Sequence, residues 1–438
     1  MKRVLIVTPH FPPINAPDHQ RVRMSLPYFK EFGWEPHILT VKPEFVIGVN
    51  DPLLVKTIPS HTSVTYAQAL PFQKTKLIGI GSLGLRCFPF LLKTGNQLLK
   101  QNKFDLIYFS TTVFIVMALG RIWHDKFNIP YVLDFQDPWL SDYYEKSGVT
   151  PPGGKLKYKF SQLQAQILEP VAMSKVSHIV SVSPEYPNRL RQRYPYLKPE
   201  QFTVLPFGAP TVDFEQLPNL NIHNRIFNCQ DGKRHWVYVG VVGNIMSLAL
   251  RILFLGIQSH RRQHPETWQS VKLHFVGTSY ATDNRAVKTV EPIAREFGVD
   301  DLVEEYTQRI PYFEALQTLV DSDGVLLIGS NDPSYTASKL YPCVLARKPI
   351  LAIFHEKSSV VNILQQCQGG ECVTFNSSIQ PQNLLEDILK KLNWLISLPK
   401  AYEPQTDWSA FKAYTAREMT RQQCSIFDNI LTVADSTS

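Results

Sequence analysis

Cysteine is scarce in this 438-residue sequence and is not arranged as a pair or as a metal site. The six residues include no CxxC spacing and no His/Cys cluster of zinc-ligand spacing; they are Cys87, Cys229, Cys343, Cys367, Cys372 and Cys424. This pattern excludes a disulfide-stapled scaffold and a zinc finger. We expect free thiols in a reducing cytosol.

Long apolar runs are missing as well. Residues 113–119 are soon followed by Arg121 and His124, so this run falls short of a membrane span. At the N-terminus, residues 4–8 form an apolar run that is too short for a signal peptide. We therefore interpret residues 4–8 as a first β-strand and expect a cytoplasmic protein.

Acidic residues are absent from residues 52–104, a segment that holds seven Lys or Arg. The net charge of +7 is uneven, because residues 1–210 carry a net +10 and the remainder a net −3. Within residues 74–103, Leu, Ile and Phe alternate with basic residues, which suits an anionic membrane surface. The alternative is a solvated helix face. No RNA- or DNA-binding motif accompanies the charge, so we predict no nucleic-acid partner.

Glycine is outnumbered by proline, 21 to 32, but the prolines are scattered and define no low-complexity tract. Apolar residues make up 44% of the chain and aromatic residues 11%, which is typical of a globular protein. A chain of 438 residues is too long for one ordinary core. We therefore expect two α/β domains.

Short apolar runs alternate with helical periodicity in both halves of the chain. In the first half we predict strands at residues 4–8, 37–41, 64–67, 106–109, 131–135, 178–183 and 202–205. In the second half we predict strands at residues 236–242, 272–276, 303–306, 325–328, 350–354 and 372–375. Predicted helices between them include residues 20–32, 159–175 and 284–297. This alternation predicts two Rossmann-like, doubly wound domains with parallel sheets covered on both faces.

The domain boundaries follow from composition. Residues 210–234 are polar and rich in Asn, without an apolar period, which indicates a linker. We therefore divide the chain into an N-terminal domain (1–210), a linker (211–234) and a C-terminal domain (235–400). We expect helices in residues 401–438 that pack back toward the N-terminal domain, and a Gly/Pro loop at residues 145–158.

Four regions place polar residues at predicted strand ends, where ligands of parallel sheets sit. Three are the loops at residues 8–23, 134–139 and 240–244, and the fourth is the strand–loop–helix–strand region 325–354. Pro342 is tolerated only in a first helical turn, so the helix cap should lie near Ser338 or Lys339. Unpaired N–H groups and the Lys339 ammonium there favour a diphosphate. The alternative is an ordinary serine cap beside a surface lysine.

Eight segments in order resemble the retaining glycosyltransferases of the GT-B fold (group 1, glycosyltransferase family 4-like). The opening VLIVTPHFPPINAPDHQRVR resembles the start of the family's acceptor domain. The later segments are FDLIYFST, IPYVLDFQDPW, VSHIVSVSPEY, FTVLPFGAP, YVGVVGN, KLHFVGTS and SKLYPCVLARKPILAI. The resemblance covers almost the whole chain. It implies two Rossmann-like domains facing a cleft, the first binding the acceptor and the second a nucleotide-sugar.

The chain departs from the family in two loops. Residues 15–19 (NAPDH) fill a stretch of the first loop where the family carries glycines. The resemblance places the family's two glutamates at Ser334 and Pro342, and neither residue is acidic. SKLYPCVLA is closest to a branch that reads SKLYEYLA, whose remaining glutamate holds the ribose hydroxyls. Ribose binding must therefore use other groups or be weaker.

The resemblance implies transfer of a sugar from a nucleotide-sugar to a hydroxyl, in the synthesis of cell-surface polysaccharide or glycolipid. Because the leaving nucleoside diphosphate gains negative charge, cations and N–H donors must stabilise it. The donor-side candidates are Gly243, Asn244, Arg251, Arg309, Ile310, Ser338, Lys339 and Tyr341. No D-x-D motif suggests a metal-held diphosphate, so we predict no metal and no cofactor beside the nucleotide-sugar substrate.

On the acceptor side, the polar candidates are Asn15, Asp18, His19, Arg21 and Asp137. The catalytic candidates are His19, Asp137 and Asp18, and His19 or Asp137 would orient or deprotonate an acceptor hydroxyl. The alternatives are structural: His19 caps the helix that starts at residue 20, and Asp137 shapes a turn before Pro138. The expected acceptor is a glycan or a lipid-linked sugar, and the basic segment fits an enzyme peripheral to the inner membrane face.

Two other functions stay open. A sugar-nucleotide epimerase would need acids to take and return a proton, and the second-domain loop offers only Asp332 nearby. A degenerate relative that binds a glycan or a partner enzyme without turnover fits the missing glutamates. Nucleoside-diphosphate binding and donor hydrolysis separate these classes.

Overall fold

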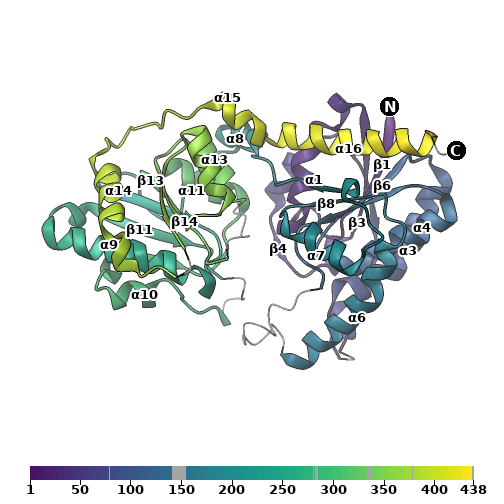
Figure 1. Cartoon of the computed structure of the whole chain (residues 1–438), viewed down its shortest axis with the longest axis horizontal. Helices are drawn as coiled ribbons and strands as arrows, with labels where there is room; N and C mark the ends of the chain where they lie inside the picture. The colour runs from purple at the N-terminus through teal and green to yellow at the C-terminus, as the bar shows by residue number, and fades with distance from the viewer. Residues whose placement is uncertain are drawn as a thin grey trace. The chain divides into compact units, whose positions relative to one another are not determined.

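The structure, a computed structural model, describes residues 1–77, 79–140, 154–279, 281, 285–332, 338–376 and 378–436. The chain forms two compact units (Figure 1). The first unit consists of Met1–Gly208 and Ala416–Ser438, and the second unit is Ala209–Thr415. Each unit has its own parallel sheet and its own buried clusters, so the predicted two-domain α/β class is confirmed.

The first unit is built on a seven-stranded sheet, and all seven predicted strands are present. Every neighbouring pair is parallel. In spatial order the strands are β5 (Ser63–Ala67), β3 (Trp34–Val41), β1 (Lys2–Val7), β6 (Leu106–Ser110), β7 (Tyr131–Phe135), β8 (His178–Ser181) and β9 (Phe202–Val204). A separate antiparallel pair joins β2 (Ile14–Asn15) and β4 (Val49–Asn50).

Helices cover both faces of this sheet. The α-helices are α1 (Gln20–Ser25), α2 (Phe72–Lys76), α3 (Leu83–Gln101), α4 (Ala118–Phe127), α6 (Lys155–Met173), α7 (Glu185–Arg193) and α16 (Ala416–Ser436). Short 3-10 turns include η1 (Pro17–His19) and η2 (Phe29–Phe32). The predicted helix 20–32 is wrong in extent: it breaks between α1 and η2 because Pro27 has no N–H to continue it.

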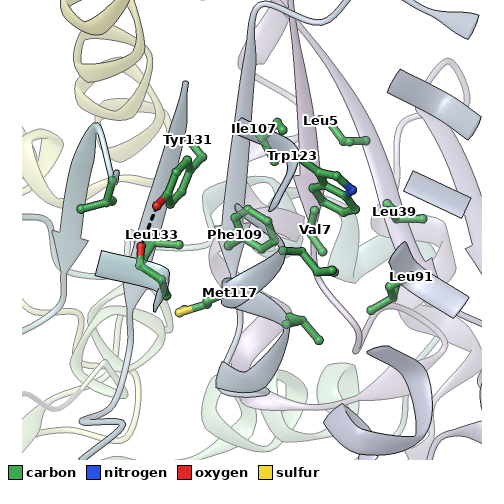
Figure 2. Close-up of a cluster of buried hydrophobic side chains, with 14 of the residues drawn as sticks. Leu5, Val7, Leu39, Leu91, Ile107, Phe109, Met117, Trp123, Tyr131 and Leu133 are labelled. Atoms are coloured by element: carbon green, nitrogen blue, oxygen red, sulfur yellow. Dashed lines mark hydrogen bonds between the residues drawn. The ribbon is translucent and has the colours of Figure 1, made fainter. Parts of the chain in front are cut away.

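Alternate residues of β1 point to opposite faces of the sheet and enter different cores. Leu5 and Val7 enter the cluster that contains Leu91 of α3 and Trp123 of α4, and the neighbouring Tyr131 donates its hydroxyl to Ala172 O of α6 (2.8 Å, Figure 2). Val4 and Ile6 enter a second cluster with Met419 and Phe427 of α16. Strand β1 is therefore buried on both faces, as its continuous apolar run predicts.

Close packing between α3 and α4 requires a glycine. A Cβ at Gly95 of α3 would overlap the ring of Trp123 on α4. The absence of a side chain at this position lets the two helices approach each other over the core.

The second unit is built on a six-stranded parallel sheet. In spatial order its strands are β12 (Val303–Tyr306), β11 (Val271–Val276), β10 (Arg234–Val239), β13 (Gly324–Ile328), β14 (Ile350–His355) and β15 (Glu371–Phe375). Its α-helices are α8 (Thr211–Gln216), α9 (Ser247–Gln263), α10 (Glu291–Glu296), α11 (Tyr312–Asp321), α12 (Leu340–Leu345), α13 (Ser359–Cys367), α14 (Leu385–Ser397) and α15 (Trp408–Phe411).

Strand β10 shows the same two-sided burial. Trp236 and Tyr238 pack with α9 and α14, whereas Val237 packs with Leu340 of α12 on the other face. The predicted helix 284–297 is shorter than expected, because α10 begins only at Glu291, one residue before Pro292. Proline fits within a first turn but not further along a helix.

The boundaries of the units differ from the expected ones. Residues 211–220 form α8 and the 3-10 turn η7 (Leu217–Leu220), and the whole segment 211–234 belongs to the second unit. The tail is divided, since α15 belongs to the second unit and α16 to the first. Helix α6 begins at Lys155, before the predicted residue 159, and the rest of the predicted loop (145–153) lies outside the described residues. No described helix has the length and apolar character that crossing a membrane requires.

Candidate functional site

In the second unit, the loop after β10 holds Lys339 over a glycine. Gly240 directly follows β10 and has a φ of 135°, in the region that favours glycine. A Cβ at position 240 would stand 2.5 Å from Lys339 Nζ, so with any other residue here the end of the lysine would have to move. The loop at residues 240–244 and Lys339, predicted separately from sequence, therefore meet at one place.

Lys339 is held in position by the strand beneath it. Its Nζ donates to Tyr238 Oη (2.8 Å) and to Val241 O (3.1 Å), and it lies 4.9 Å from the centre of the Tyr238 ring. Desolvation lowers the pKa of Lys339 to about 8. A half-buried ammonium with a lowered pKa gains more from an anion than a solvated lysine does.

Four strand ends meet around this loop. Val242 donates its N–H to Thr278 O after β11 (3.0 Å), and Gly277 donates to Tyr306 O at the end of β12 (2.8 Å). The backbone of Arg309 lies against Gly277, and Asn331, after β13, donates its N–H to Ile245 O (2.8 Å). The carboxyl ends of β10, β11, β12 and β13 thus form one polar edge, the usual place for a ligand in such sheets.

Several predicted donor residues lie at this edge. Gly243 and the exposed Asn244 belong to the loop itself, and half-buried Arg309 and Ile310 follow β12. Ser338 is exposed beside Lys339. Lys339 is the N-cap of α12, within the predicted range, but α12 has only six residues. A helix this short has a small dipole, so the cation is the stronger attraction for an anion.

Two predicted donor residues point elsewhere. Arg251 lies in the second turn of α9 and forms a bidentate, exposed ion pair with Glu296 of α10. Tyr341 is buried in α12, where its ring stacks on Tyr414 and contacts Phe411. Pro342 lies in the first turn of α12, as predicted, and Ser334 lies outside the described residues.

The sequence does contain one D-x-D triplet, Asp321-Ser322-Asp323, contrary to the expectation, but it lies at the opposite edge of the sheet from this loop. It precedes β13, and Asp323 Oδ2 accepts a hydrogen bond from the N–H of His235, at the start of β10 (2.9 Å). Among the described residues, no three His, Cys, Asp or Glu side chains are grouped as a metal site would require.

In the first unit, Asp18 is the centre of a buried network at the ends of β1 and β6. Its carboxylate accepts from His10 Nδ1 (2.9 Å), Thr111 Oγ1 (3.0 Å) and the N–H of Thr112 (3.1 Å). Burial alone would raise the pKa of Asp18, but the hydrogen bond and charge of His10 and the Thr112 N–H outweigh it and lower the pKa to about 2. Asp18 is therefore ionised and fully engaged, which suits fixing the loop better than proton transfer.

Arg21 and Asp134 form a second, fully buried part of this network. Arg21 Nε donates to Asp134 Oδ2 (2.8 Å), and its Nη2 donates to Leu205 O (2.6 Å). Asp134 Oδ2 also accepts from Ser110 Oγ (2.8 Å) and from Gln136 Nε2 (3.1 Å). These hydrogen bonds connect α1, β6, β7 and the chain after β9. Arg21 therefore stabilises this end of the sheet and does not reach solvent.

His19 is fully buried. Its Nε2 donates to Ile14 O (2.8 Å), and its Nδ1 has no hydrogen-bond partner among the described residues. Desolvation and then the charge of Arg23 lower the pKa of His19 to about 4. The side chain also makes no cap hydrogen bond to α1. The structure therefore places His19 inside the loop, where the backbone nitrogen of Ala16 lies 3.3 Å from its Nε2, without the predicted cap of α1 and without exposed surface.

Asp137 has the most accessible carboxylate of the acceptor-side candidates. It lies two residues after β7, and the residue is exposed. Neighbouring protein atoms nevertheless displace part of the water around its carboxylate. This desolvation and then the charge of Asp18 raise the pKa of Asp137 to about 6. A carboxylate with a pKa near neutrality can accept a proton from a bound hydroxyl. Asn15, by contrast, is buried in β2 and donates to Asp51 Oδ2 (3.4 Å).

Four residues that contact the candidates were not among the predicted site residues: His10, Asp134, Gln136 and Tyr238. Asp134 lies within β7 and Gln136 directly follows it, and both belong to the predicted segment 134–139; a polar residue at or just after a strand end was the available signal. Tyr238 gave no such signal, because it occupies an ordinary inward position of β10.

The two units together have the organisation of the GT-B class of folds: two Rossmann-like domains with parallel sheets and polar strand-end loops. No protein-family model and no curated protein sequence matches this chain. Solved structures do.

One is Alr3699/HepE of Anabaena in complex with UDP and glucose, with 16% identity, a TM-score of 0.60, and coverage of 98% of this chain and 100% of that one. A glycosyltransferase of Rickettsia africae matches with 12% identity and a TM-score of 0.54, over 98% of each chain. A UDP-forming α,α-trehalose-phosphate synthase of Burkholderia xenovorans matches with 8% identity and a TM-score of 0.61, over 97% of this chain and all of that one. The predicted GT-B fold is therefore confirmed.

Proposed function

We propose that this chain is a glycosyltransferase that moves a sugar from a nucleotide-sugar to a hydroxyl acceptor. The observation that carries the proposal is the desolvated Lys339 ammonium above Gly240, at the edge where four parallel strands end. The fold supports it, and Alr3699/HepE, which shares the fold, was solved with UDP and with UDP-glucose.

In this proposal Lys339 binds the diphosphate, and the loop at Gly243 and Asn244 contributes backbone N–H groups. Arg309 and Ile310 lie beside the loop and contact the nucleobase. As the bond to the sugar breaks, negative charge builds on the leaving diphosphate, and a preorganised ammonium stabilises that charge. The reaction we propose is retaining and needs no metal.

On the acceptor side, we assign proton transfer to Asp137. Its pKa of about 6 leaves it ionised at neutral pH and still basic enough to take a proton. The Asp18–His10 and Arg21–Asp134 contacts hold the loops on which the acceptor rests. The acceptor class that we propose is a cell-surface glycan or a lipid-linked sugar, met at the inner face of a membrane.

A thermal-shift experiment with UDP, GDP and ADP tests the donor site. A ligand at about 100 times its Kd stabilises the folded state by about 2.7 kcal/mol, so the binding nucleotide should raise the Tm of the second unit. Loss of a charged hydrogen-bond donor should weaken binding by about 10- to 100-fold in Lys339→Ala. The exposed Lys390 of the same unit provides a control, and Lys390→Ala should respond like wild type. If no nucleotide shifts the wild type, or if Lys339→Ala responds equally, the donor site is not here.

A second candidate is a binding protein that has lost turnover. It is favoured by Pro342 at a position where the resemblance implies a glutamate, and by the engagement of Arg251 with Glu296. Such a protein would bind a nucleoside diphosphate or a glycan but release no UDP from UDP-glucose. An epimerase would instead interconvert the free nucleotide-sugar, which product analysis detects.

A further inference from the structure

Five apolar side chains form a line along the exposed side of α6. Their exposed fractions are 87% for Leu156, 59% for Phe160, 55% for Leu163, 60% for Ile167 and 38% for Val171. Spacings of three or four residues place them on one side of the helix over about four turns. We call these five residues the α6 stripe.

The α6 stripe lies opposite the side by which α6 packs on its own unit. At about 100° per residue, the centre of the stripe is roughly 180° from the buried residues Ala165, Glu169 and Ala172. A surface helix normally turns polar residues outward. An apolar line that long on the outer side therefore indicates an interaction surface.

Positive charge borders the stripe. Lys157 and Lys159 are both exposed, and helical geometry puts them about 80° to either side of the stripe. The one acid in α6 is Glu169, which is buried and bound by Arg193 Nη2 and by Tyr194 Oη, each at 2.9 Å. Within α6, the exposed charged residues are thus all cationic.

The basic segment 74–103 belongs to the same layer of the first unit. Helices α3, α4 and α6 lie side by side on this sheet, with α4 packed against both others (Figure 1). Lys93 and Lys100 of α3 are exposed, whereas Leu91, Leu98 and Leu99 are turned into the core. In this layer of helices, α3 contributes exposed lysines and α6 contributes exposed apolar side chains.

We propose that the α6 stripe docks the first unit on an anionic phospholipid surface. Phe160, Leu163 and Ile167 enter the boundary of the acyl chains, and Lys157 and Lys159 extend to the headgroup phosphates. An apolar helix face flanked by lysines is the pattern of an interfacial helix, and each lysine adds attraction to anionic lipid. The inference rests on α6 and its charge, and it does not depend on sugar transfer.

A second copy of the chain fits the stripe less well. In a pairing of two stripes, the bordering lysines find no exposed acid on the facing α6. A stable interface also buries about 800 Å² on each partner, more than one line of side chains supplies. Lipid satisfies both the apolar line and the flanking charge.

Flotation of the full-length chain with phosphatidylcholine vesicles, with and without phosphatidylglycerol, tests the proposal. Wild type should bind the anionic vesicles. Phe160→Gln/Leu163→Gln/Ile167→Gln should lose at least about tenfold in affinity, since each substitution removes apolar groups that would be buried among the acyl chains. Lys157→Gln/Lys159→Gln should lose roughly fivefold for each lysine, and this loss should shrink at high salt.

The matched control is Val287→Gln/Val433→Gln, which removes exposed apolar side chains (72% and 63%) from other places and should bind like wild type. The proposal is overturned if wild type does not float with anionic vesicles, or if the stripe variant binds as well as the control. It is also overturned if sedimentation shows that the stripe variant loses self-association rather than lipid binding. The thermal shift by UDP should be the same in all these variants, so its loss would concern the donor site alone.

Discussion

Lys339 links ligand binding to pH at the scale of a single residue. Its pKa of about 8 means that the ammonium is charged below that pH and neutral above it in the free protein. A bound diphosphate would raise this pKa, because opposite charge favours the protonated form. We therefore predict that UDP affinity falls as pH rises through 8, and that binding takes up a proton above this pH.

Calorimetry in buffers of different ionisation enthalpy measures this proton directly. The phosphates of UDP are already ionised there, since a phosphate titrates near pH 6. In Lys339→Met the uptake should vanish. Equal proton uptake in wild type and Lys339→Met would show that another group carries the linkage.

Asp137 is the residue whose titration should shape the rate. Protonation below its pKa of about 6 removes the base, so the release of UDP from UDP-glucose should slow as pH falls through 6. In Asp137→Asn we expect a rate lower by about 10²- to 10⁴-fold and no such limb. UDP should still shift the Tm of this variant, because the substitution lies in the first unit. A limb near pH 6 that survives in Asp137→Asn would assign the base elsewhere.

The sequence could predict which loops form the candidate site, but not where their side chains point. Strand ends followed by polar residues are local patterns, and they located the strand-end loops that contain Gly240, Lys339 and Asp137. The directions of Arg251 and Tyr341 depend on Glu296 and Tyr414, which lie 45 and 73 positions away. No local pattern carries that information, and the same holds for the partners of Asp18 and Arg21.

At the scale of elements, the α3–α4 contact offers a direct test of packing. Gly95→Ala would raise helix propensity by about 1 kcal/mol, yet the new Cβ would overlap Trp123. We predict that overpacking dominates and that the variant loses about 1–3 kcal/mol of unfolding free energy in chemical denaturation. Gly95→Ala/Trp123→Phe, which makes room for the Cβ, should be less destabilised than the two single changes together. A stabilised Gly95→Ala would show that the helices can separate without cost.

Strands were better predicted than helices because the two signals differ. Most strands of these parallel sheets are short apolar runs, and all thirteen could be located, including the less buried β5, β9 and β12. Helix ends depended on prolines such as Pro27 and Pro292, whose effects fall one or two residues away. For α6 the periodicity indicated a helix, but periodicity cannot tell whether an apolar stripe faces the core or solvent, and here it faces solvent.

At the scale of the whole chain, the C-terminal helix belongs to the first unit, although the second unit lies between them in the sequence. The second unit is one continuous stretch, Ala209–Thr415, with its own core clusters. The first unit is completed only by α16, whose Met419 and Phe427 pack with Val4 and Ile6 of β1. Composition could not place this division, since the polar segment 211–234 belongs to the second unit.

Deletion of residues 416–438 should therefore damage one unit and spare the other. Removing α16 exposes Val4, Ile6 and Tyr108, and each lost burial of a large side chain costs about 1.5–3 kcal/mol, so the first unit should unfold at a much lower temperature. The second unit should keep its calorimetric transition and, because Lys339 is intact, its stabilisation by UDP. A peptide of residues 416–438 added in excess should restore part of the first transition. A truncated chain that keeps both transitions unchanged, or one that also loses the response to UDP, would contradict this division of the molecule.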